Sequence, residues 1–216
     1  MEWAVLGLFI MFLIVTYIVV QGTRAALAWR KAAAEGDVKV IRDIVEDSLG
    51  AWRSMKRPKE VPAEVWRGIQ SMQIVEVDAE VVRVSCQAEG DFRLLNGRWV
   101  ETANPLHEAM AVTVKGLDML LYELPHYKPG RVQIDVYMTM READRATERV
   151  CILSTTATRE NARQIDWEEW TPAQIVEALS GRYRMDDLGQ PLPIQVEAPK
   201  RTEAEHVGTP APPSKR

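Results

Sequence analysis

Residues 131–141, RVQIDVYMTMR, contain the clearest secondary-structure pattern in the chain. Their side chains alternate between an apolar set and a mainly polar set. The apolar set is Val132, Ile134, Val136, Met138 and Met140, and the other set is Gln133, Asp135, Tyr137 and Thr139. Successive side chains of a strand point to opposite faces, so this pattern predicts a β-strand with one buried face. A polar turn and a second apolar segment, residues 148–158, predict its antiparallel partner.

The segment before this strand predicts the central helix of a domain. Asn104 is a suitable N-cap, and Pro105 suits the first helical turn. Apolar side chains then recur at spacings of three or four, at Leu106, Met110, Val114, Leu117, Leu121 and Leu124. This spacing predicts a helix over residues 105–124. The alternative is a strand up to Gly116, because the apolar residues of 110–114 also alternate.

Two β-rich segments lie further towards the N-terminus. In residues 72–88 the valines occupy odd-numbered positions up to Val81 and even-numbered positions from Val82, so the alternation changes face near 78–82. A strand cannot change face by itself, so we predict a bulge or tight turn there. Asn96–Gly97 separates Phe92–Leu95 from Arg98–Thr102, and both turn residues tolerate positive φ. This arrangement predicts a two-residue β-hairpin.

Helices are predicted on both sides of the β-rich region. Residues 38–55 place apolar side chains at helical spacing, and Asp37 is a suitable N-cap. The sequence Thr171-Pro172-Ala173-Gln174 is a capping box that opens a helix to about Ser180. Because we find no βαβ alternation, these elements predict an α+β domain over residues 37–185. In this domain helices pack on one face of an antiparallel sheet.

Residues 3–20, WAVLGLFIMFLIVTYIVV, contain no charged side chain. At about 1.5 Å per residue, a helix of this length spans a hydrocarbon core of roughly 30 Å. We therefore predict a transmembrane anchor over residues 1–22, whose partner is the lipid bilayer through Trp3–Val20. A cleaved signal peptide is the alternative, and residues 25–28 contain a weak A-x-A site for it. The long apolar run and the acidic Glu2 before it do not favour cleavage.

The flanks of this segment predict its orientation. No Lys or Arg precedes it, whereas Arg24, Arg30, Lys31 and Lys39 follow it closely. The positive-inside rule then places the C-terminal domain in the cytoplasm, on a single-pass protein of the cell membrane.

Two segments outside the domain complete the organisation of the chain. Residues 23–36 are rich in alanine and predict a helical stalk that continues the membrane helix and ends at Glu35–Gly36. Residues 186–216 are rich in proline and lack apolar periodicity, which predicts a disordered tail.

Composition and motifs restrict the function. The 216-residue chain has a formal net charge of −4, whereas nucleic-acid binders usually present a basic face, so we predict no nucleic-acid partner. The sequence contains no HExxH, CxxC, GxSxG or phosphate-binding glycine motif. His107 and His126 lie at opposite ends of the predicted central helix, roughly 28 Å apart, and His206 lies in the tail. We therefore predict no catalytic residue, no metal ligand, no cofactor and no enzymatic activity.

Three further groups of residues were weighed as sites. Cys86 and Cys151 lie on predicted strands, and two buried free thiols are favoured over a redox pair or disulfide. The second group is basic and consists of Arg53, Lys56, Arg57 and Lys59. It could contact anionic lipid, but we favour a loop that contacts only solvent. The third group is acidic and aromatic and consists of Asp166, Trp167, Glu168, Glu169 and Trp170. It could be a docking surface, but we favour a place in the core.

These observations favour a membrane-tethered binding or scaffolding module with a protein partner. A ligand-binding sensory domain is an alternative, because a curved sheet can enclose a pocket. A second alternative is an assembly subunit of an envelope secretion or pilus machine. The order of elements over residues 37–158 resembles the ferredoxin-like domains of pilus and type II secretion inner-membrane subunits. This resemblance lies in element order alone and implies a periplasmic domain, against the charge bias.

Overall fold

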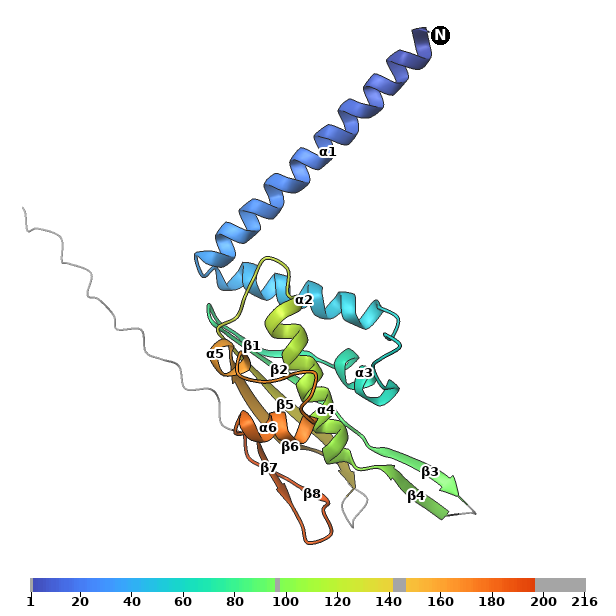
Figure 1. Ribbon diagram of the computed structural model, residues 1–216, viewed down its shortest axis with the longest axis vertical. Coiled ribbons are helices and arrows are strands. Elements are labelled where there is room, and N and C mark those ends of the chain that lie inside the picture. Colours follow the sequence, from blue (N-terminus) through green and yellow to red (C-terminus); the bar gives the residue numbers. More distant parts are fainter. Residues whose placement is uncertain (1, 96–97, 142–146, 197–216) are drawn as a thin grey trace, which may run out of the picture.

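The computed structural model describes residues 2–95, 98–141 and 147–196 (Figure 1). Its α-helices are α1 Glu2–Ala34, α2 Val38–Ser54, α3 Ala63–Gln70, α4 Pro105–Asp118, α5 Arg159–Ala162 and α6 Pro172–Ala178, and a π-helix η1 covers Met119–Glu123. Its strands are β1 Gln73–Val77, β2 Val81–Gln87, β3 Asp91–Leu95, β4 Arg98–Ala103, β5 Arg131–Arg141, β6 Thr147–Thr158, β7 Arg182–Met185 and β8 Pro191–Leu192. The predicted α+β class is confirmed.

The main sheet has the strand order β1-β2-β5-β6-β7-β8 and is mixed. β2 and β5 pair in parallel, while the other neighbours pair antiparallel. The prediction of a wholly antiparallel sheet is therefore wrong at this one pair. The chain between β2 and β5 contains α4, and a crossover of that length returns the next strand in the same direction. The β3–β4 hairpin inserted before α4 hid this βαβ unit in the sequence.

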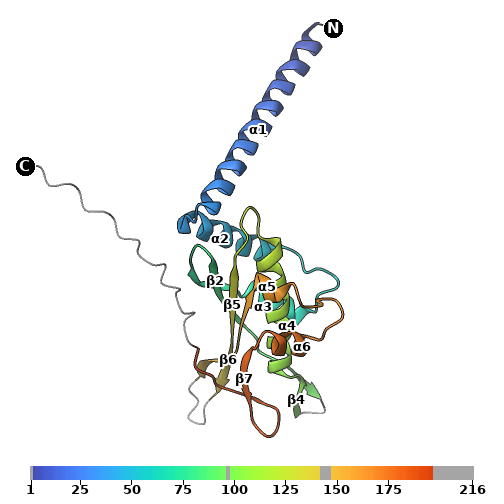
Figure 2. The ribbon, with the colours of Figure 1, turned by 60° about the vertical axis from the view of Figure 1, so that its left-hand side comes forward.

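Helices cover one face of the sheet (Figure 2). α4 packs on β5 and β6 and also contacts α3 and α6. The central helix predicted over residues 105–124 is confirmed, with Asn104 accepting a hydrogen bond from the amide of Leu106 at 2.8 Å. The last turns of this helix are the π-helix η1. The alternative of a strand up to Gly116 is wrong, since apolar side chains at helical spacing bury one stripe against the sheet.

The strand predicted over residues 131–141 is β5, but its second face is also buried. Gln133 and Asp135 are only 3% and 0% exposed. The prediction of a single buried face is therefore wrong in the first half of the strand. Burial of these polar groups is possible because they bond to one another and to the neighbouring strands.

The turn predicted near residues 78–82 is confirmed, since β1 and β2 form a tight hairpin closed by a bond from the Asp78 amide to the Val81 carbonyl. The predicted second hairpin is also present as β3 and β4, which form a separate two-stranded sheet. Its turn, Asn96–Gly97, lies outside the described residues. In Figure 1 this hairpin projects from the domain at the end away from α1.

The predicted C-terminal helix is α6, and both halves of its Thr171–Gln174 capping box are formed. The domain continues beyond the predicted boundary at residue 185. β8 pairs with β7, and the amide of Ile194 donates to the carbonyl of Cys151 at 2.9 Å. The prediction of a disordered tail is therefore wrong for residues 186–196, because the chain gains strand partners there. The rest of that prediction, 197–216, lies outside the described residues.

Candidate functional site

The site begins with α1, which is one continuous helix through the predicted anchor and stalk. The large apolar side chains between Phe9 and Val20 lie outside the core: Phe12 is 64% exposed and Ile18 is 62% exposed. Within the described part of the chain, this is the one helix that is long and apolar enough to cross a membrane. The prediction that the stalk continues the apolar helix is confirmed.

A short capped corner joins α1 to the domain. Gly36 has a φ of +80°, and the amides of Gly36 and Asp37 donate to the carbonyls of Ala33 and Ala32. This is the Schellman pattern of a helix C-terminus. The Asp37 side chain then accepts from the amides of Lys39 and Val40 and caps α2. The corner therefore satisfies the helix ends by itself and leaves no flexible linker between α1 and α2.

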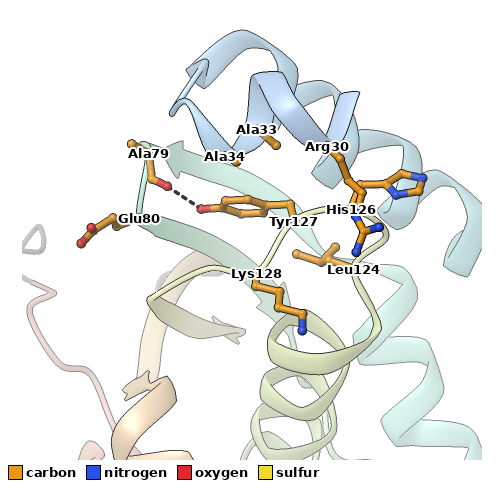
Figure 3. A pocket seen from close by; sticks show the side chains of 9 residues that line it. All are labelled: Arg30, Ala33, Ala34, Ala79, Glu80, Leu124, His126, Tyr127 and Lys128. Atoms are coloured by element: carbon orange, nitrogen blue, oxygen red, sulfur yellow. Dashed lines mark hydrogen bonds between the residues drawn. The ribbon is translucent and has the colours of Figure 1, made fainter. Parts of the chain in front are cut away.

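A pocket of about 800 Å³ lies at this corner (Figure 3). α1 contributes one wall, the turn between β1 and β2 a second, and the loop between η1 and β5 a third. Its lining residues are Arg30, Ala33, Ala34, Ala79, Glu80, Leu124, His126, Tyr127 and Lys128. The pocket is open to solvent, and it is formed where a long helix meets two loops from distant parts of the chain.

Tyr127 forms the centre of this pocket. Its ring is buried, and its hydroxyl donates to the carbonyl of Ala79 at 3.1 Å. Burial, followed by the nearby carboxylates of Glu80 and Asp78, raises the pKa of Tyr127 to about 12. The phenol therefore stays neutral at physiological pH and acts as a fixed hydrogen-bonded wall.

Basic side chains from α1 and from the loop after η1 line the pocket beside Tyr127. Figure 3 shows Arg30 and His126 beside one another there, with Ala79 and Glu80 on the other side of the ring. Arg30, His126 and Lys128 have no hydrogen bond or ion pair with any described residue. His126 also has a φ of +63°, a left-handed conformation that is uncommon outside glycine. The pocket thus presents two cations, Arg30 and Lys128, that form no ion pair with a described residue, and one carboxylate, Glu80, on the other side of Tyr127.

Sequence reasoning assigned Arg30 to the flank of the membrane helix, where it suits the headgroup region and predicts orientation, and considered His126 only for its distance from His107. It did not single out Lys128. The structure brings Arg30, His126 and Lys128 together from two distant segments, and no short motif connects those segments. His107 is exposed in the first turn of α4, far along the helix from His126, as expected. His206 lies outside the described residues.

A second group of ionisable residues lies on the sheet face opposite α4. The carboxylate of Asp135 accepts from Arg83 Nε at 2.6 Å, from Ser154 Oγ at 2.7 Å and from Gln133 Nε2 at 2.9 Å. Each oxygen of this buried carboxylate therefore has a partner. Such a network links β2, β5 and β6, and the buried carboxylate has no exposed surface at which a ligand could bind.

Cys86 and Cys151 are buried free thiols, as favoured from the sequence. Cys86 lies on β2 and Cys151 on β6, the two strands that flank β5. In the register of the sheet, Cys86 pairs with Val136 and Cys151 pairs with Tyr137. Successive residues of β5 face opposite sides of the sheet, so the two thiols do too. Burial raises the pKa of both thiols, to about 12 for Cys151. Neither thiol is therefore activated as a nucleophile.

The acidic-aromatic group is divided between core and surface. Trp167 is half-buried, donates from Nε1 to the carbonyl of Ala162 at 3.0 Å and packs edge-on against Tyr122. Trp170 is 40% exposed, and Asp166 accepts from two following amides in a turn. The core prediction is thus confirmed for Trp167 and wrong for Trp170, because the turn directs the second ring outwards.

Two members of the basic group donate to backbone carbonyls of the domain. Arg53 donates to the carbonyl of Met72 and Arg57 donates to the carbonyl of Val61. Lys56 and Lys59 are exposed. No geometry here distinguishes lipid contact from solvent, so the favoured solvated loop stays a prediction.

Among the described residues, no three His, Cys, Asp or Glu side chains are grouped so that they can hold a metal ion. The comparisons with known proteins add no family: no protein-family model, no curated protein and no solved structure matches this chain.

Proposed function

We propose that this protein is a single-pass membrane protein whose α+β domain is a cytoplasmic binding module held close to the bilayer. The exposed apolar half of α1 is the observation that carries the proposal. Removing a large apolar side chain from water is worth about 1.5–3 kcal/mol. A whole helix of such side chains is therefore unstable in water, and lipid is the solvent that suits it.

The corner at Gly36–Asp37 supports the idea that the domain is presented in a defined orientation. Since the two helix ends are capped and directly adjacent, the domain cannot swing on a linker as a flexible tether would allow. A module held in this way is suited to meeting a partner or ligand beside the membrane. The basic residues after the apolar run favour the cytoplasmic side.

Membrane fractionation tests the anchoring. The full chain is expected in the membrane pellet after alkaline carbonate washing, and detergent is expected to release it. As a matched control, a chain without residues 2–22 is expected in the supernatant. If the full chain were found in the supernatant without detergent and without loss of its N-terminus, the anchoring would be disproved.

A cysteine-labelling experiment tests the side of the membrane. Leu188 is 85% exposed, so Leu188→Cys gives an accessible thiol, while the natural chain, with both thiols buried, is the control. A membrane-impermeant maleimide is expected to label Leu188→Cys only after the cells are opened. Labelling of intact cells would place the domain outside and favour the envelope-assembly alternative.

A further inference from the structure

We propose that the pocket between α1 and the loop after η1 binds a small organic phosphate. The proposal goes beyond tethering, because it names the chemical class of a ligand. It is carried by three features: unneutralised cations, a buried apolar floor and the position of the pocket relative to the bilayer.

The cations define the charge of the ligand. Arg30 and Lys128 carry permanent positive charges at neutral pH, and His126 adds imidazole nitrogens that bond to oxygen. Arg30, His126 and Lys128 have no partner among the described residues, and the one carboxylate that lines the pocket, Glu80, lies on the other side of Tyr127. A guanidinium matches two oxygens of a phosphate, and a lysine ammonium binds it as a point charge. Two permanent charges suit a phosphate dianion better than a single carboxylate.

The size and floor of the pocket indicate an organic group on that phosphate. The volume of about 800 Å³ lies within the roughly 300–1,000 Å³ of small-molecule sites. It exceeds what inorganic phosphate fills. Ala33, Leu124 and the Tyr127 ring are buried and apolar beside the cations (Figure 3). They provide a surface on which a carbon group attached to the phosphate can pack.

The position of the pocket favours a soluble ligand over a lipid headgroup. Arg30 follows Val20 by ten residues, which is roughly 15 Å along a helix. The headgroup layer of each leaflet is only roughly 5–8 Å thick. An upright α1 therefore places Arg30 beyond the headgroups of the bilayer that surrounds residues 3–20. The ligand then comes from the aqueous side.

Binding at this place also affects the anchor. Arg30 belongs to α1, whereas His126 and Lys128 belong to the loop before β5. A phosphate held by both segments connects the long helix to the domain across their shared corner. The ligand thus reinforces the fixed orientation of the domain.

Calorimetric titration of the full chain in phosphatidylcholine nanodiscs tests the site, with phenyl phosphate as the probe. We expect saturable binding, weaker binding of inorganic phosphate, and no binding of phenol. Arg30→Gln and Lys128→Gln are each expected to weaken binding at least tenfold, because each removes a charged hydrogen-bond donor. Lys31→Gln is the matched control, since Lys31 is exposed and pairs with Glu35 at 3.8 Å. It is expected to change binding less than twofold.

Loss of affinity equal in Lys31→Gln and Arg30→Gln would overturn the site, because it would indicate a general charge effect. Absence of phenyl phosphate binding would also overturn it. Nanodiscs that contain phosphatidylglycerol test the lipid source: unchanged affinity supports a soluble ligand, and competition overturns it. If the chain does not enter nanodiscs, the same titration is done in solution. Phosphate binding there would mean that only the anchoring has failed, so the two failures are distinguishable.

Discussion

The α1 helix and the β5 strand break the usual rule of apolar inside and polar outside in opposite ways. α1 leaves large apolar side chains in contact with the surroundings, with Phe12 64% exposed. β5 buries Asp135 completely. The first arrangement suits a helix whose backbone bonds are internal and whose solvent is lipid. The second suits a carboxylate that three neighbours satisfy.

The comparison teaches that hydropathy alone does not place a side chain. What decides is whether its groups find suitable partners in the medium around it. For α1 the partners are proposed to be lipid chains. For Asp135 they are Arg83, Gln133 and Ser154. Substitutions in each region therefore have different consequences, which we order from the largest expected effect to the smallest.

The largest effect is expected in α1. The double variant Leu13→Arg/Ile14→Arg puts two charges at the centre of the proposed span, at a cost of about 2.5–3.5 kcal/mol each on insertion scales. We expect the protein to leave the carbonate-washed membrane pellet. The matched control is Leu27→Arg/Ala28→Arg, which adds the same charges in the stalk and is expected to stay in the pellet. Equal behaviour of the two double variants would contradict lipid burial of residues 3–20.

A smaller loss is expected in the network of β5. Asp135→Ala leaves the Arg83 guanidinium, which is 10% exposed, without its carboxylate. Breaking one partner of a buried ion pair costs about 3–5 kcal/mol. Urea unfolding of the full chain in detergent measures this loss. The double variant Arg83→Met/Asp135→Leu removes both charges and is expected to recover most of the stability. If the double variant did not recover stability, the network would contribute more to the free energy of unfolding than the pairing of the two charges.

The stability of the contact between α6 and β6 is expected to depend on side-chain volume instead of charge. A Cβ at Gly181 would lie 2.4 Å from Val176 Cγ1 and 2.8 Å from Thr155 Oγ1. We therefore expect Gly181→Ala to destabilise the domain by about 1–3 kcal/mol through overpacking. Gly50→Ala in α2 is the control, since nothing lies within 4 Å of its Cβ, and it is expected to stabilise the helix slightly. Thermal unfolding of the two variants should shift in opposite directions.

The smallest effect is expected at the corner that joins the two regions. Asp37→Ala removes the acceptor for the amides of Lys39 and Val40 and should cost about 1 kcal/mol. Amide hydrogen exchange should become faster in the first turn of α2, while β5 and β6 stay protected. Asp37→Asn keeps an acceptor and is expected to resemble the natural chain. Faster exchange throughout the domain would mean that the corner supports the whole fold.

The sequence by itself determined the elements that rest on local physical chemistry. Helical spacing before β5 predicted α4, alternation predicted β5, and the Thr171–Gln174 capping box predicted the start of α6. The end of the stalk at Glu35–Gly36 and the N-cap Asp37 were also predicted, because a helix stop and an N-cap are properties of a few adjacent residues. The apolar run of residues 3–20 predicted a continuous helix for the same reason, and its membrane span stays a prediction.

Only the tertiary structure decided which distant segments meet. Arg83 and Asp135 are 52 positions apart, and their pairing depends on β2 and β5 being parallel neighbours. Arg30 and Lys128 line one pocket only because α1 ends beside the loop before β5. Periodicity reports the face of one element, whereas strand order and loop contacts depend on the packing of the whole chain. For that reason the sequence predicted the α+β class but neither the mixed sheet nor the cationic pocket.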